Sequence, residues 1–143
     1  MHAFCDGVMF SVASYGRLQN IHEKLLIAVK EYIEMEGTDL YGNEKMVDLL
    51  VSVLSNRNGI DRYKMFDLFQ CREFSMYDLD GIFPFLQIDE IGVMSAWQSK
   101  KFLKTYHLIK DYVDNCIKSK DRTFDIEEIF KFSVDNNEDI HFS

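Results

Sequence analysis

The clearest helical pattern of the chain lies in residues 17–36, which read RLQNIHEKLLIAVKEYIEME. Apolar residues recur there at three- and four-residue steps, from Leu18 through Leu25 to Met35. This spacing places them on one side of a helix, and glutamates and lysines fill the other side. We therefore predict an amphipathic helix over residues 17–36 that packs its apolar side against the core of the protein.

Weaker helical patterns follow this segment along the chain. They begin after Asn43, after Asp61 and near Ser75, all of them residue types that favour the N-cap position of a helix. In the helix that follows Asp61, the spacing of the apolar residues predicts that Tyr63, Phe66 and either Phe69 or Gln70 lie on the buried side. Residues 83–85, which read FPF, should interrupt regular structure, because proline has no amide hydrogen to donate.

The second strong amphipathic pattern covers residues 100–118. Before it, Asp89 is a candidate N-cap for a helix that includes Met94 and Trp97. A last helix is predicted from Asp125 to about residue 134, since Asp125 and Glu128 have the spacing of a capping box.

The two ends of the chain give weaker signals. The apolar run from Ala3 to Tyr15 fits either a helix or a short strand, because periodicity does not distinguish the two over so few residues. We favour a helix there. Residues 135–143 are polar and acidic, and we expect a frayed tail unless Ile140 and Phe142 dock on the domain.

Length and composition predict one mainly α domain. The chain has 143 residues, of which 47% are apolar, with only one proline and seven glycines. A chain of this size builds a single core, and the scarcity of turn residues favours helices over a sandwich or barrel. We predict a bundle of about five to seven helices in residues 1–134, followed by an acidic tail in residues 135–143.

Charge and cysteine content restrict the kinds of partner and the cellular compartment that fit this sequence. The net charge is −8, which disfavours nucleic acid and anionic membranes and favours a basic protein partner. The start of the chain lacks the basic segment of a signal peptide, and no apolar run reaches the roughly 18 residues of a membrane-spanning helix. The odd number of cysteines, Cys5, Cys71 and Cys116, favours a reducing, cytoplasmic location and buried free thiols.

No motif in the sequence specifies a reaction. His22 and His107 lie on separate predicted helices, and no histidine or cysteine spacing is typical of a metal site. Residues 78–81, which read DLDG, resemble the start of a calcium loop, but the glycine stands at the fourth position instead of the sixth. A helix end followed by a turn explains them better. We expect no catalytic residue, no cofactor and no metal.

The acidic residues concentrate at the end of the chain. Residues 121–143 carry two basic and seven acidic residues, a net charge of −5, while Lys100, Lys101, Lys104 and Lys110 form a basic helix face. The acidic residues either pair with these lysines or steer a basic partner. We predict five steering residues and two aromatic anchors for a partner protein: Glu127, Glu128, Asp135, Glu138 and Asp139, with Tyr77 and Phe85.

The function that the sequence favours is a stoichiometric protein-binding factor. An immunity protein or inhibitor that neutralises a basic partner, for example a nuclease toxin, is the leading form of this hypothesis. In length, acidity and lack of catalytic motifs the chain resembles small bacterial immunity proteins. The alternatives are a viral or phage host-interaction protein with a helix-binding groove and a small enzyme whose site leaves no local motif.

Overall fold

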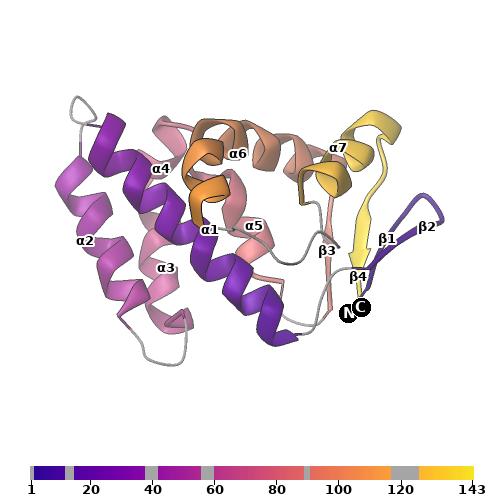
Figure 1. Ribbon diagram of the computed structural model, residues 1–143, viewed down its shortest axis with the longest axis horizontal. Coiled ribbons are helices and arrows are strands. Elements are labelled where there is room, and N and C mark those ends of the chain that lie inside the picture. The colour runs from indigo at the N-terminus through magenta and orange to yellow at the C-terminus, as the bar shows by residue number, and fades with distance from the viewer. Residues whose placement is uncertain (1, 12–14, 38–41, 56–59, 89–90, 117–125) are drawn as a thin grey trace.

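A computed structural model describes residues 2–11, 15–37, 42–55, 60–88, 91–116 and 126–143. In these residues the chain forms seven α-helices, one short 3-10 helix and a four-stranded sheet (Figure 1). The buried apolar side chains form one hydrophobic core that draws on both the helices and the sheet. The prediction of a mainly α single domain is therefore confirmed.

The two strongest sequence patterns form the two longest helices. Helix α1 (Tyr15–Glu36) packs against α2 (Asn43–Leu54) and against α6 (Ala96–Cys116), which in turn packs against α7 (Ile126–Asn136). The chain between α2 and α6 forms shorter elements, namely α3 (Arg62–Gln70), α4 (Arg72–Met76), η1 (Asp80–Ile82) and α5 (Phe83–Leu86). The predicted cap of the last helix, Asp125, lies outside the described residues.

Helix α3 begins where predicted but turns its other side to the core. The Asp61 carboxylate accepts hydrogen bonds from the amides of Tyr63 and Lys64 at 3.1 and 3.2 Å, as an N-cap should. Met65 and Leu68 are the buried residues of this helix, whereas Tyr63 is 94% exposed and Phe66 is 61% exposed. The prediction was wrong for Tyr63 and Phe66, whereas Phe69 is partly buried and packs against the core. Helix α3 packs against α2, and its buried residues are Met65 and Leu68.

Pro84 does not interrupt regular structure, which corrects a second expectation. It occupies the first turn of α5, where a helix leaves amide groups without an internal acceptor, so the missing amide hydrogen costs nothing.

The helix predicted to contain Met94 and Trp97 was wrong in its first half. Residues 92–94 form strand β3 (Gly92–Met94), and α6 starts only at Ala96. The cap of α6 is Ser95, whose hydroxyl accepts from the Gln98 amide at 3.1 Å while Gln98 Oε1 accepts from the Ser95 amide at 2.9 Å. This reciprocal pair is a capping box, and it fixes the change from strand to helix. Asp89, the predicted cap, lies outside the described residues.

The N-terminal segment is a β-hairpin, so the preference for a helix there was wrong. Strands β1 (His2–Cys5) and β2 (Val8–Ser11) are joined by Asp6 and Gly7, whose φ angles are 49° and 75°. Two consecutive residues with positive φ are typical of a type I′ turn, for which Asp-Gly is a preferred sequence.

The C-terminal residues complete the sheet. Strand β4 (Ile140–Phe142) pairs with β1 on one side and with β3 on the other, so the antiparallel order is β2-β1-β4-β3. Ile140 and Phe142 are buried. Ile140 and Phe142 thus dock on the domain, which was the condition for an ordered tail, and residues 140–142 belong to the folded domain. Ala3 lies opposite Phe142, which brings the two ends of the chain together (Figure 1).

The core is centred on the ring of Phe85, which has no exposed surface. Its centroid lies 4.9 Å from that of His22 on α1, 5.7 Å from Phe102 on α6, 5.5 Å from Phe130 on α7 and 6.1 Å from Phe142 on β4. Phe85 thus joins the sheet to the helices. A ring held in this way is not available to a partner, which corrects the expectation that Phe85 anchors one.

Candidate functional site

The outer face of the sheet carries a row of exposed side chains. The strand registers place Met9, Phe4, His141 and Val93 next to one another across all four strands. Successive residues of a strand point to opposite faces, so this row lies opposite the buried residues of the same strands. Met9 is 58% exposed and Val93 is 52% exposed, and Phe4 and His141 are also exposed. We call these four residues the outer row.

Two further exposed apolar residues precede and follow strand β3 in the sequence. Ile91 precedes Val93 by two residues, and Trp97, in the first turn of α6, is 67% exposed. Monomeric proteins expose contiguous apolar surface sparingly, and where they do so it often marks a site of interaction. Trp97 was predicted to lie in a helix, as it does, but the outer row itself was missed. The missed signal was the Asp6-Gly7 turn, which favours a hairpin between two short apolar runs.

An acidic group lies at one end of this sheet. Asp6 is in the turn between β1 and β2, and Glu138 and Asp139 directly precede β4. Because Cys5 is opposite Ile140, these three carboxylates lie at the same end. Burial raises the pKa of the Cys5 thiol. The negative charges of Asp6, Glu138 and Asp139 raise this pKa further, so all three carboxylates act on the same thiol. We call Asp6, Glu138 and Asp139 the acidic end.

The remaining predicted residues are placed elsewhere. Glu127 and Glu128 are in the first turn of α7, whereas Asp135 is in its last turn, about 12 Å further along the helix. Tyr77 is half-buried in the turn after α4. The structure therefore brings Glu138 and Asp139 together with Asp6 and separates them from Glu127 and Glu128.

Glu127 makes contacts within the protein. Its carboxylate lies 3.1 Å from Nε2 of His107 and 3.2 Å from Nζ of Lys110, both on α6. Partial burial acts to raise the pKa of Glu127, but the hydrogen bonds with His107 and Lys110 outweigh it and hold the pKa below its ordinary value of 4.5. Glu127 thus connects α7 to α6.

We expect this connection to weaken in acid. A carboxylate whose folded-state pKa is lowered contributes stability above its ordinary pKa and loses that contribution as the pH falls through the lowered value. Urea unfolding should therefore show Glu127→Gln to be less stable than the wild type at about pH 6, with the difference closing towards about pH 3. Asp67→Asn, which removes an exposed carboxylate on α3, is the control for the loss of one charge. A constant difference between Glu127→Gln and the wild type across this range would contradict the ion pair.

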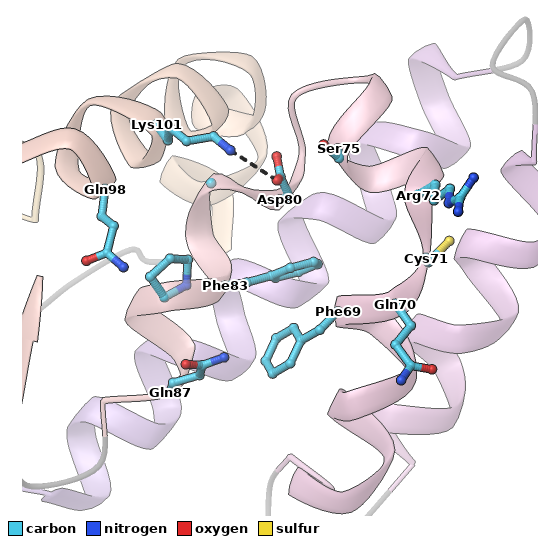
Figure 2. Close-up of a pocket in the computed structure, with 12 residues that line it drawn as sticks. Phe69, Gln70, Cys71, Arg72, Ser75, Asp80, Phe83, Gln87, Gln98 and Lys101 are labelled. Atoms are coloured by element: carbon cyan, nitrogen blue, oxygen red, sulfur yellow. Dashed lines mark hydrogen bonds and ion pairs between the residues drawn. The ribbon is translucent and has the colours of Figure 1, made fainter. Parts of the chain in front are cut away.

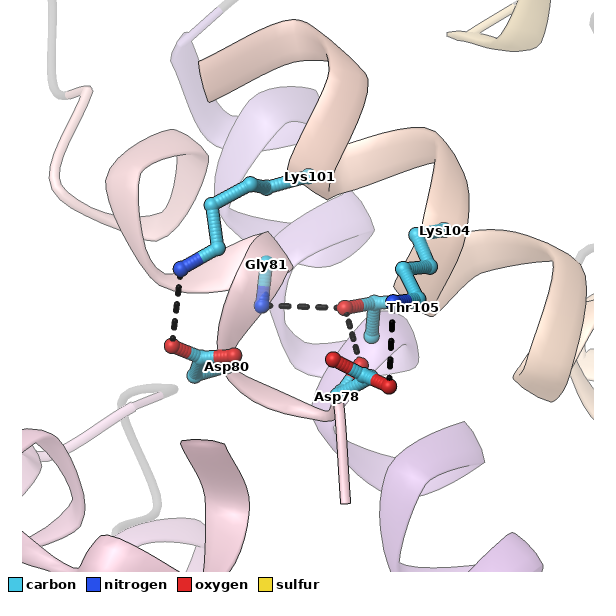
Figure 3. Close-up of polar contacts among 6 residues, drawn as sticks. All are labelled: Asp78, Asp80, Gly81, Lys101, Lys104 and Thr105. Carbon is cyan, nitrogen blue, oxygen red and sulfur yellow. Dashed lines mark hydrogen bonds and ion pairs between the residues drawn. The ribbon is translucent and has the colours of Figure 1, made fainter. Parts of the chain in front are cut away.

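Residues 78–81 are held against α6 by polar contacts (Figure 3). The Thr105 hydroxyl donates to the Asp78 carbonyl at 2.6 Å and accepts from the Gly81 amide at 2.9 Å. The carboxylate of Asp78 lies 3.2 Å from Lys104 Nζ, and that of Asp80 lies 3.4 Å from Lys101 Nζ. Both carboxylates are paired with lysines, so this turn attaches the 3-10 helix to α6, and the basic face of α6 is partly neutralised within the protein.

A hollow lies between α3, α4, α5 and α6 and has a volume of about 370 Å³. Figure 2 shows the rings of Phe69 and Phe83 at its centre, and their centroids are 5.1 Å apart. Glutamine side chains lie around these rings, while Arg72 and Cys71 point away from them (Figure 2). The rim consists of Gln70, Gln87 and Gln98, together with the paired Lys101 and Asp80.

The thiol beside this hollow is poorly suited to nucleophilic catalysis. Cys71 Sγ donates to Glu73 Oε2 at 3.0 Å, and burial together with this hydrogen bond raises the pKa of the thiol. A raised pKa keeps the thiol protonated, whereas catalysis requires the thiolate. No histidine is among the described residues that line the hollow. The two phenylalanine rings at its centre can accept a small apolar group.

Two features are absent from the described part of the chain. In those residues no group of three or more histidine, cysteine, aspartate or glutamate side chains is arranged to hold a metal ion. Among the helices that the structure describes, none combines the length and the apolar character needed to cross a membrane.

Comparison with protein-family models, with curated proteins and with solved structures finds no match for this chain. The fold and its surface therefore define the class: a mainly α domain with a small antiparallel sheet at one end, and an exposed apolar row beside three carboxylates on that sheet.

Proposed function

We propose that the protein is a stoichiometric binding factor for a basic partner protein, which it contacts through the outer face of the sheet. The observation that carries this proposal is the outer row of Met9, Phe4, His141 and Val93 beside the acidic end. Covering this apolar surface would supply affinity, since a few well-buried apolar and aromatic anchors dominate most interfaces. An inhibitor or immunity protein that covers the basic surface of a toxin is the form of this function that we favour.

The charges of the acidic end act on the rate of association. Rim charges change the on-rate and its salt dependence more than the lifetime of a complex. Glu138 and Asp139, two of the predicted steering residues, are exposed and lie at the rim of the outer row. Glu127 instead is paired with His107 and Lys110, so we assign it a structural part and leave the steering to the acidic end.

We expect capture of one partner from an extract of the native host, at equal stoichiometry, with binding that weakens as salt rises. Val93→Lys places a positive charge in the outer row and should weaken this capture at least tenfold, since it repels a basic partner and interrupts the apolar surface. Glu138→Lys should mainly slow association. Affinity purification followed by interferometry measures both effects.

The matched control is Phe66→Lys, which places the same charge on α3. Phe66 is an exposed aromatic residue outside the sheet, so its replacement should leave capture unchanged. Circular dichroism checks that each variant is folded. Equal capture by the wild type and Val93→Lys would contradict the proposed surface.

A second candidate function is supported by the hollow around Phe69 and Phe83. Together with the exposed Tyr63 and Phe66 on α3, it offers an apolar surface between helices, as a helix-binding host-interaction protein would. The same experiment distinguishes the two functions, because loss of capture in Phe66→Lys with normal capture in Val93→Lys would favour this candidate.

A further inference from the structure

Strand β2 is an edge of the sheet. In the described residues it pairs with β1 on one side and with no strand on the other. Its four residues, Val8-Met9-Phe10-Ser11, contain no charge and no proline. Proteins usually protect an edge strand with lysine, proline or a bulge, because its open amide and carbonyl groups pair readily with another chain. The hairpin also projects from the end of the molecule (Figure 1).

The register shows which backbone groups face this open edge. Cys5 and Val8 are opposite one another across a two-residue turn, so they form a hydrogen-bonded pair. Bonding alternates along an antiparallel pair, and the next residue, Met9, therefore directs its amide and carbonyl away from β1. The side chain of Met9 belongs to the outer row, so a strand added here would extend the exposed apolar face.

Charge distinguishes between the possible occupants of this edge. A second copy of the chain carries the same net charge of −8 and is repelled. An added strand antiparallel to β2 has its C-terminal end beside the Asp6 turn. Glu138 and Asp139 precede β4, three strand spacings from the added strand, about 14 Å and beyond the Debye length of about 8 Å at physiological salt. A basic residue at that end of the strand is therefore attracted first by Asp6, and more weakly by Glu138 and Asp139.

We propose that the basic partner contributes an extended segment that adds to the edge of β2 as an antiparallel strand. The segment alternates apolar and polar residues and carries lysine or arginine at its C-terminal end. This inference rests on the proposed function, because it states how the partner of the outer face is bound. Backbone hydrogen bonds from Met9 hold the strand, and the acidic end sets its direction.

Two synthetic peptides test this proposal on the full chain. Both alternate valine and threonine over about eight residues, a common strand length, and they differ only in having two lysines at the C-terminal or at the N-terminal end. We expect the C-terminal lysine peptide to bind about tenfold more tightly in titrations followed by amide chemical shifts. Binding should also protect the Met9 amide from hydrogen exchange, because that amide becomes hydrogen-bonded.

The matched variants are Met9→Pro and Met9→Ala. Both remove the methionine side chain, but only proline removes the amide hydrogen at the edge. We expect Met9→Pro to lose peptide binding at least tenfold relative to Met9→Ala. If Met9→Pro does not fold, as judged by its melting curve, protection of the Met9 amide in the wild type decides the matter.

Four results would overturn the inference. They are equal binding by the two variants, tighter binding of the N-terminal lysine peptide, binding without protection of the Met9 amide, and a concentration-dependent dimer of the protein that Met9→Pro abolishes. Normal capture of the native partner together with no binding of either peptide would overturn strand addition alone and leave the proposed function standing.

Discussion

Phe85→Ala is expected to lower the free energy of unfolding by about 4 kcal/mol, within the usual range for a buried phenylalanine. The ring has no exposed surface, and its aromatic neighbours come from α1, α6, α7 and β4. Removing it leaves a cavity where the sheet meets the helices, and five elements meeting there have little freedom to close it. The loss should therefore lie well above that of an average substitution.

Urea unfolding followed by circular dichroism measures this loss. Phe66→Ala is the matched control, because it makes the same replacement at an exposed ring on α3 and should cost less than about 1 kcal/mol. Phe85→Leu should fall between the two, since leucine fills part of the space. A cost for Phe85→Ala no greater than that for Phe66→Ala would show that Phe85 is not the centre of the core.

Gly81→Ala is expected to cost about 3 kcal/mol, the upper part of the usual range for overpacking. A Cβ atom at position 81 would overlap the backbone carbonyl oxygen of Lys101 and the hydroxyl of Thr105. Backbone atoms inside a long helix cannot move aside cheaply. The substitution must therefore push the 3-10 helix away from α6, which breaks the hydrogen bond from the Gly81 amide to Thr105.

The matched control for this change is Gly92→Ala. There the added Cβ atom would first meet Cδ1 of Ile88, the far end of a flexible side chain, so the cost should be small. Both variants are compared with the wild type by thermal and urea unfolding. Similar stabilities for Gly81→Ala and Gly92→Ala would contradict the close approach of the 3-10 helix to α6.

The long helices were predictable because their signals are local. The apolar stripe of residues 17–36 repeats over several turns, and so does that of residues 100–116, so neither pattern needs knowledge of the rest of the chain. The start of α3 was predictable for the same reason, because Asp61 caps the amides of its own neighbours. The buried side of α3 was not, since it depends on the angle at which α3 packs against α2, which no local pattern states.

The sheet was harder to predict for a physical reason. Strands β3 and β4 have only three residues each, too few for alternation to be visible, and their pairing joins segments far apart in the sequence. The Asp6-Gly7 turn did carry a local signal for a hairpin. The short apolar run beside this turn also fits a helix, and the prediction of a helix rests on that run.

The candidate site also combines features that the sequence determines with features that only the tertiary structure decides. Composition by itself determined that the chain is a mainly α domain with a strong excess of acid, because propensity and charge belong to single residues and their neighbours. Only the tertiary structure decided that Asp6 lies at the same end of the sheet as Glu138 and Asp139, that Phe4, Met9 and Val93 are exposed, and that Phe85 is buried. Whether an apolar side chain is exposed or buried depends on what packs against it. In this protein the covering elements come from distant parts of the chain.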